Sequence, residues 1–219
     1  MWCIGEITVE YRQRMEELLG LYARSYDPQE PVVCLDEKSK QLLQQTRAPL
    51  PMQGGGVARE DYEYKRAGTR NIFLAVEPKG QRREAAVTSR RTKSDFVGFV
   101  KHLVDGVYQG AQQVHLVLDN LNTHFRGSFE EVLGVERAEQ FLRRVQFHYT
   151  PKHASWLNMA EIEIGIMERQ CTGRRMGTES VLASEVAAWQ QRRNQAGAGI
   201  EWKFTRQDAE RKLAKYYVA

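Results

Sequence analysis

The sequence predicts a mixed α/β fold with a central sheet and extra helices at the C-terminus. Three observations support this. Strand-like and helix-like hydrophobic patterns alternate along most of the chain. The 219 residues, 42% of them hydrophobic, can bury one sizeable core. No internal repeat or low-complexity segment interrupts the pattern.

The first third of the chain predicts a helix, a strand and a long loop. Apolar residues recur at helical spacing from 8 to 25, and "DPQEP" ends the pattern. The run "VVCLDE" predicts a short buried strand that ends in Asp36 and Glu37. Residues 45–61 hold two prolines and three consecutive glycines, which predicts a loop without structure of its own.

The middle of the chain predicts a hairpin, a helix and a second buried strand. Residues 69–78 and 83–90 flank Lys79-Gly80 and are β-rich, so a hairpin is expected. Ser94 is predicted to cap an amphipathic helix that Gly110 ends. The run "VHLVLD" then predicts a strand that delivers Asp119 to its end.

The last part predicts a helical stretch at 128–144, a strand at 145–151 and a helix opened by Ser155. Two more helical patterns follow, at 179–195 and 206–217. We therefore expect three parts: a helix and linker (1–30), an α/β core (31–177) and a C-terminal helical extension (178–219).

Composition narrows the classes of function. The chain has no apolar run of about 18 residues and no signal-peptide pattern, which favours a soluble cytoplasmic protein without membrane contact. Its three cysteines form no CxxC pair, so neither a zinc site nor a disulfide framework is indicated. The net charge of +4 and the arginine doublets fit a polyanionic partner and a solvated mixed-charge surface about equally.

Asp36 and Asp119 are the first candidate functional residues, because each ends a predicted strand. Ligand groups gather at the carboxyl edge of an α/β sheet, so the two carboxylates converge if their strands are neighbours. Two close carboxylates repel each other unless they are protonated or bridged by a cation. Mg²⁺ is held by a few carboxylate oxygens together with waters and phosphates.

Glu161 is the best candidate for a third acid. Leu157 lies one turn before it, which places Glu161 on or beside the sheet-facing stripe of its helix, while Glu163 is expected to point elsewhere. Gly165 is expected to leave room near it. The alternative for Glu161 is an edge carboxylate paired with Arg169 or Lys152.

Three motifs then point to a family. The runs "VVCLDE", "VLDNLNTH" and "HYTPKHASWLNMAEIE" resemble those of the DDE transposases of bacterial insertion sequences in the mariner-like superfamily. The resemblance extends from about Pro31 to the C-terminus and includes the "TRNIFLAVEPKG" hairpin and "WKFT". In that family an Asn precedes the glutamate by three positions, as Asn158 precedes Glu161 here.

The resemblance implies an RNase H-like fold with a mixed five-stranded sheet flanked by helices. It also implies that Asp36, Asp119 and Glu161 hold two Mg²⁺ or Mn²⁺ ions and catalyse DNA cleavage and strand transfer by in-line displacement. The implied partners are transposon-end DNA, target DNA and a second copy of the chain.

Two features depart from the family pattern. Asp119 and Glu161 are 42 positions apart, and the extra length falls in a segment, 127–140, that predicts helix. The chain also begins only about thirty residues before Asp36, with room for one helix rather than an end-recognising helix-turn-helix module. We therefore expect a catalytic half: a fragment, the second frame of a split gene or a remnant.

Further residues around the acids are candidates of lesser weight. Asn120, His124 and Asn158 are expected to support the acids, although Asn120 and His124 fit turn or capping roles as well. The predicted DNA contacts are basic residues, with a solvated surface as the alternative for the first two: Lys152, His153, Lys65 and Arg66.

Three functions remain open at this point. The leading one is a metal-dependent transposase that cuts transposon ends and joins them to target DNA. The second is a nuclease of the same fold without strand transfer. The third is a non-catalytic DNA-binding remnant of a transposase.

Overall fold

The computed structural model describes residues 6–48, 50–54, 56–57, 59 and 61–218. Within them, five strands form one mixed sheet in the order β3-β2-β1-β4-β5. β1, β2 and β3 pair in antiparallel fashion, whereas β4 and β5 run parallel to β1. The strands are β1 (Val32–Gln45), β2 (Tyr64–Glu77), β3 (Arg82–Thr88), β4 (Val114–Leu118) and β5 (Val145–Tyr149). The predicted mixed five-stranded sheet is confirmed.

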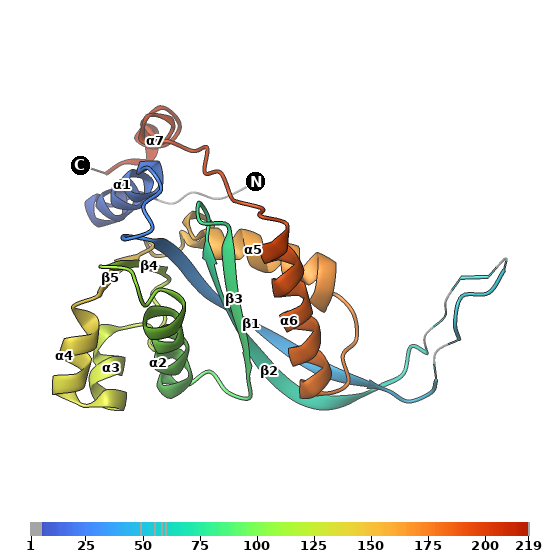
Figure 1. Cartoon of the computed structure of the whole chain (residues 1–219). Coiled ribbons are helices and arrows are strands. Elements are labelled where there is room, and N and C mark those ends of the chain that lie inside the picture. The colour runs from blue at the N-terminus through green and yellow to red at the C-terminus, as the bar shows by residue number, and fades with distance from the viewer. Residues whose placement is uncertain (1–5, 49, 55, 58, 60, 219) are drawn as a thin grey trace.

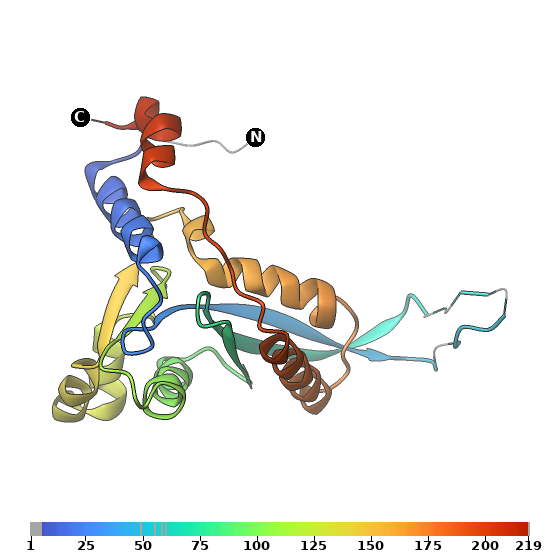
Figure 2. The same ribbon diagram turned by 45° about the horizontal axis from the view of Figure 1, so that its top comes forward.

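Helices cover both faces of the sheet (Figures 1 and 2). Side chains of one face, such as Leu35, pack in a core with α2 (Lys93–Lys101), α3 (Arg126–Leu133) and α4 (Val135–Leu142). Side chains of the other face, such as Cys34 and Leu74, pack against α1 (Val9–Ala23), α5 (Met159–Met167) and α6 (Glu179–Gln195). This alternation follows from the two-residue period of a strand.

α7 (Arg206–Leu213) packs on α1 rather than on the sheet (Figure 1). Arg206 Nε donates to Glu16 O at 2.8 Å, and Ala209 and Leu213 share a core with α1. α6 packs on β3, where Trp189 is almost fully buried. The three-part division at 30/31 and 177/178 stays a prediction.

β1 is much longer than the predicted strand. It was expected to end at Asp36-Glu37, but it continues to Gln45 because β2 pairs with it along its length. β4, by contrast, pairs with β1 only from Val32 to Cys34. Asp36 therefore lies where β1 loses its parallel neighbour, not at the end of a strand.

Beyond that point a chain segment lies along the free edge of β1. Leu43 N donates to Met176 O at 2.8 Å, and Lys40 Nζ donates to the carbonyl oxygens of Thr172 and Arg174. The segment 172–176 thus covers an edge that β4 does not reach.

The segment between β1 and β2 is a projecting hairpin rather than the unstructured loop that was predicted (Figure 1). Leu50 forms a backbone bridge with Arg59, and Gln53 forms another with Gly56, so antiparallel pairing continues outside the two strands. The side chains of Met52 and Val57 are largely exposed. Gly55, in the glycine run, lies outside the described residues.

Several helix starts differ from the predictions. α2 is capped by Thr92, whose hydroxyl and backbone form a capping box with Asp95, and not by Ser94. Ser155 begins a short 3-10 turn (Ser155–Leu157), and Asn158 caps α5. Gly134, with a positive φ of 81°, divides the predicted helical stretch into α3 and α4. α6 has the predicted bounds.

Short helical turns extend some of these elements. Two π-helical turns follow α2 and α5, at His102–Val107 and Glu168–Thr172, and a 3-10 turn, Ala214–Tyr216, follows α7. Cys34 and Cys171 are buried and unpaired, and Cys3 lies outside the described residues. Of the helices in the described part of the chain, none combines the length and apolar content that crossing a membrane requires.

Candidate active site

Asp36 and Asp119 lie side by side at the carboxyl end of the parallel strands. Cys34 is in register with Val117, so the two aspartates, each two residues further on, occupy matching positions. Asp36 is only 8% exposed. Burial raises the pKa of its carboxyl to about 7; a hydrogen bond from Glu37 N opposes this shift, and the charges of Glu161, Asp119 and Glu37 add to it.

Glu161, in the first turn of α5, is close enough to act on the charge of Asp36. Asn158 fixes this helix against β1. Its Nδ2 donates to Leu35 O at 3.0 Å, and its Oδ1 accepts from Ala160 N at 3.1 Å. Because Leu35 precedes Asp36, Asn158 connects the helix that carries one acid to the strand that carries another.

Glu161 lies beside the buried stripe of α5 rather than on it, and the prediction that Glu163 points elsewhere is wrong. The buried stripe of α5 runs through Ala160, Glu163, Ile164 and Met167, so Glu163 faces the interior and Glu161 is exposed. The start of the helix and its packing decide which residues face the interior. The run "AEIEIGIM" does not show this, because acids and isoleucines alternate in it.

The alternative given for Glu161, an edge carboxylate in an ion pair, does not hold, and neither does the role expected of Gly165. Neither Arg169 nor Lys152 forms an ion pair with Glu161 among the pairs within the described residues. A Cβ at Gly165 would meet only Arg169 Nη1, at 3.5 Å, so this glycine does not make room for Glu161. Glu161 is therefore an exposed acid near Asp36 without a cationic partner in the described part of the chain.

His124 is brought directly against Asp119. Its Nδ1 lies 2.6 Å from Asp119 Oδ1, and its Nε2 lies 2.7 Å from Glu37 Oε1. The imidazole is fully buried and packs on the ring of Phe96, with 4.6 Å between centroids. Tyr149 Oη donates to His124 O at 2.8 Å, which fixes the backbone.

Both ring nitrogens of His124 face carboxylate oxygens, so both donate when the two acids are ionised. Burial alone would lower the pKa of His124, but the hydrogen bonds to Asp119 and Glu37 and the charges of these acids raise it to about 9. Sequence reasoning missed the part played by Glu37. The available signal was its position next to Asp36, with a side chain on the opposite face of β1.

Asn120 points away from the acids. Its Nδ2 donates to Thr150 O at 2.6 Å, and its Oδ1 accepts from Arg14 Nη1 at 2.8 Å. It therefore joins the end of β4 to the end of β5 and to α1, which is a structural role.

The predicted DNA-contacting residues fall in two places. Lys152 and His153 are exposed in the segment after β5, where His153 has a positive φ of 61°. Lys65 and Arg66 are exposed on β2, opposite Gln44 and Leu43. That position is seven to eight residues along β1 from Asp36, or roughly 25 Å at about 3.3 Å per residue.

The three acids suit a divalent ion in their chemistry but do not enclose one as they stand. No group of three His, Cys, Asp or Glu side chains within the described residues could hold a metal ion in its present arrangement. The donors are carboxylate oxygens, which Mg²⁺ and Mn²⁺ prefer. Burial, with a further contribution from the neighbouring acids, raises the pKa of Asp36, and a bound cation would favour its ionised form.

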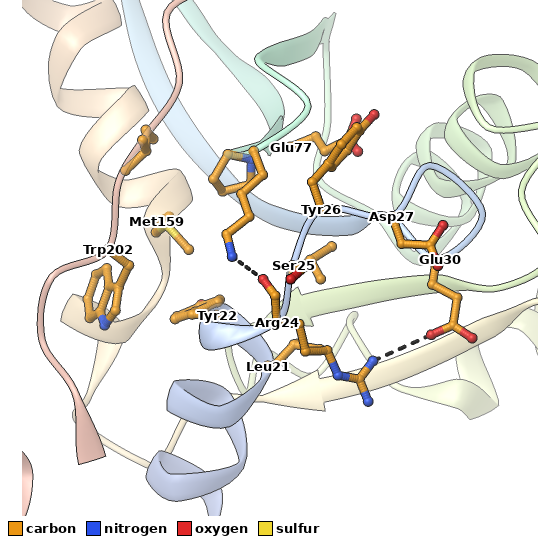
Figure 3. Close-up of a pocket in the computed structure, with 14 residues that line it drawn as sticks. Leu21, Tyr22, Arg24, Ser25, Tyr26, Asp27, Glu30, Glu77, Met159 and Trp202 are labelled. Atoms are coloured by element: carbon orange, nitrogen blue, oxygen red, sulfur yellow. Dashed lines mark hydrogen bonds and ion pairs between the residues drawn. The ribbon is translucent and has the colours of Figure 1, made fainter. Parts of the chain in front are cut away.

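A separate cavity of about 310 Å³ lies at the start of β1 and does not include the three acids. Figure 3 shows Tyr22 and Trp202 on one side of it and Tyr26 on the other. Arg24 lies at the rim, where its Nη1 is 3.6 Å from Glu30 Oε2. Its lining is apolar with a charged rim.

Comparisons with known structures bear on the fold. The crystal structure of the Mos1 mariner paired-end complex with Mn is similar with a TM-score of 0.52 and 13% identity, covering 90% of this chain and 61% of that one. The complex with Mg gives 0.55 and 13%, covering 100% and 66%. This chain thus spans about 60 to 66% of the length of these proteins. The likeness confirms the RNase H-like fold.

Among curated proteins, none matches the sequence. A protein family described as "DDE superfamily endonuclease" matches residues 31–182. This match covers more than half of the chain and contains Asp36, Asp119 and Glu161. The chain therefore belongs to the DDE superfamily of endonucleases.

Proposed function

We propose that this chain is the catalytic domain of a transposase, which cuts DNA at transposon ends and joins the ends to target DNA. The observation that carries the proposal is that Asp36 and Asp119 occupy matching positions on neighbouring strands and that the charges of Asp119 and Glu161 both act on Asp36. Membership of an endonuclease superfamily supports it. The similar Mos1 structures are paired-end complexes.

We assign Asp36, Asp119 and Glu161 as the ligands of two divalent ions, Mg²⁺ or Mn²⁺. When bound, such ions supply an activated water or 3′-hydroxyl and a stabilised leaving oxygen for in-line displacement. The chain holds Asp36 on a central strand and Glu161 on a helix that Asn158 secures to that strand. This rigid mounting fixes the carboxylates relative to a scissile phosphate.

The basic residues fit DNA along two parts of the molecule. Lys152 and His153 lie in the segment between β5 and α5, near the acids, where they can contact phosphates beside the cut. Lys65 and Arg66 lie roughly 25 Å away along the hairpin, a length of about seven base pairs at 3.4 Å each. We infer that DNA extends from the acids along this hairpin.

The test is cleavage of labelled transposon-end DNA in the presence of Mg²⁺. Asp119→Asn should abolish cleavage because it removes a charged ligand, and should leave DNA affinity nearly unchanged because the fold and basic residues remain. Asp105→Asn, a half-exposed aspartate paired with Lys101, is the matched control and should cleave normally. Unchanged cleavage by Asp119→Asn would disprove the site assignment.

The products separate the three candidate functions. Joined products from the wild-type chain support a transposase, and hydrolysis alone supports a nuclease of the same fold. DNA binding without any product supports a non-catalytic remnant.

We further propose that two copies act together on DNA in the bacterial cytoplasm. A reducing compartment suits the buried, unpaired thiols of Cys34 and Cys171. Sedimentation with and without end DNA tests the first point: a complex that contains a single copy would contradict it. Cell fractionation tests the second.

A further inference from the structure

Glu37 is linked to both aspartates of the candidate site, directly to Asp36 and through His124 to Asp119. Its backbone N donates to Asp36 Oδ1 at 2.7 Å. Its side chain reaches Asp119 through one intermediate, because Glu37 Oε1 lies 2.7 Å from His124 Nε2 and His124 Nδ1 lies 2.6 Å from Asp119 Oδ1. One residue on β1 therefore connects the strand that carries Asp36 to the loop that carries Asp119.

The burial of Glu37 is costly for the fold. Its side chain is 1% exposed, and its Oε2 is buried without a hydrogen-bond partner among the described residues. Leaving a buried acceptor unpaired costs about 1–3 kcal/mol, and more for a charged group. Glu163, by contrast, accepts hydrogen bonds on both of its oxygens.

We propose that Glu37 is a positioning residue for the divalent-metal site, acting through His124 to orient the carboxylate of Asp119. This inference rests on the proposed function, because it takes Asp36, Asp119 and Glu161 as the metal ligands. It adds a fourth acid that does not touch the metal.

The oxygen atoms used in these contacts support this role. Both described contacts of Asp119, from His124 Nδ1 and from Leu121 N at 3.2 Å, fall on Oδ1. The contact from Glu37 N to Asp36 likewise falls on Oδ1. Each aspartate thus keeps Oδ2 for another ligand, and the side chain of Asp119 is 30% exposed. Ligating carboxylates in metal sites are commonly held by such hydrogen bonds.

The experiment measures Mn²⁺ binding to the full chain by electron paramagnetic resonance, together with the melting temperature without metal. Glu37→Met removes the contact to His124 at similar volume. We expect its Mn²⁺ affinity to fall by about 10- to 100-fold, the usual effect of losing such a partner. We expect its melting temperature to fall as well, because the buried Nε2 of His124 loses its acceptor, so affinity is compared at a temperature where both chains are folded. Glu37→Gln keeps an acceptor and should recover part of the affinity.

Glu17 provides the matched control. Its Oε1 lies 2.6 Å from Nδ1 of the buried His148, so it repeats the carboxylate–imidazole contact away from the acids. Glu17→Met should therefore leave Mn²⁺ affinity unchanged. A fall equal to that of Glu37→Met would overturn the proposal, because the effect would then not be specific to the site.

His124→Gln tests the same link from its centre and decides the matter if Glu37→Met does not fold. A glutamine amide carries its donors on one nitrogen and cannot donate to two acids on opposite sides, as an imidazolium can. Weaker Mn²⁺ binding supports the proposal. Unchanged binding in a folded variant overturns it.

Failure of the proposed function gives a different result. A wild-type chain that binds no Mn²⁺ overturns the metal site itself, and the role of Glu37 with it. A wild-type chain and a Glu37→Met variant that bind Mn²⁺ equally overturn only the role of Glu37. A chain whose Mn²⁺ affinity depends on Glu37 but that cuts no DNA leaves the positioning role of Glu37 standing and overturns the proposed transposase activity.

Discussion

Two buried glutamates on different sides of the sheet have opposite surroundings. Glu163 lies between Arg83 and Arg193, and both of its oxygens accept hydrogen bonds. Glu37 shares one histidine with Asp119 and leaves its Oε2 unpaired in the described part of the chain. Glu163 and its two arginines together carry a net positive charge. The group around Glu37, with Asp36 included, carries a net negative charge.

The comparison separates a structural acid from one near a reaction site. Burial would raise the pKa of Glu163, but hydrogen bonds from Arg83 and Arg193 outweigh it and lower that pKa. At Asp36, burial and neighbouring acids raise the pKa of the carboxyl to about 7. The ionised form of Glu163 is thus stabilised by neighbouring cations. The ionised form of Asp36 is destabilised by its surroundings, which fits a site that binds a cation.

The arginine cluster is itself imperfect. Arg83 Nε lies 3.0 Å from Glu163 Oε1, within ion-pair range, yet it is not aligned to donate a hydrogen bond. Arg83 Nη1 is also buried without a hydrogen-bond partner in the described part of the chain. Both oxygens of the Glu163 carboxylate therefore have hydrogen-bond donors, whereas the Arg83 guanidinium does not use all of its own.

The largest expected effect is a loss of folding stability in the Glu163→Ala variant. This change leaves the guanidiniums of Arg83 and Arg193 without their carboxylate, and breaking a buried pair costs about 3–5 kcal/mol. The free energy of unfolding from urea titration measures it. Mn²⁺ affinity should not change. A loss below about 1 kcal/mol would contradict the description of Glu163 as a structural acid.

The next effect is a pH dependence of the metal-free chain. Between the unfolded pKa of 3.8 and the folded pKa of about 7, folded Asp36 holds a proton that the unfolded chain has lost. Stability should therefore fall as pH rises from 4 to 7, by up to roughly 4 kcal/mol. Urea titrations with a chelator, compared between wild type and Asp36→Asn, isolate this contribution.

Glu163 should change stability with pH in the opposite direction to Asp36, so it serves as the internal control. Because its folded pKa is lowered, its contribution is present above its usual value of 4.5 and is lost as pH falls. The difference in stability between wild type and Glu163→Gln should shrink at acid pH. If both variants show the same sign, the comparison of the two clusters fails.

The smallest effect on stability is expected for Asn158→Ala. This variant alters the start of α5, the helix that carries both Glu161 and Glu163. Loss of the helix cap costs about 0.5–2 kcal/mol, and Leu35 O loses its donor. Cleavage should fall as well, since the helix is no longer held to β1. Full cleavage at the lower stability would show that Asn158 supports only the fold.

The sequence was sufficient for the kind and order of the elements, because long periodic segments such as 179–195 carry their own signal. It was not sufficient for features set by partners. β1 extends to Gln45 because β2 pairs with it, and α5 begins after Asn158, which caps the helix at Ala160 N while it binds Leu35 O. The exchange of Glu161 and Glu163 follows from the second of these, since the start of a helix sets which residues face the core.

The candidate site was predictable at Asp36 and Asp119, where an acid follows a buried apolar run in a recognisable motif. The role of Glu37 was not, because its position next to Asp36 does not show that its side chain is buried and reaches His124, 87 positions later. Only the pairing of β1 with β4 brings these residues together.

The half of β1 that β4 does not reach has a consequence for solubility. Past Cys34 this strand has β2 on one side only, and the segment 172–176 covers the other side through Leu43 N and Met176 O. An open strand edge is a template to which another chain adds. Displacing this short segment would therefore favour self-association and aggregation, even with every acid of the site in place.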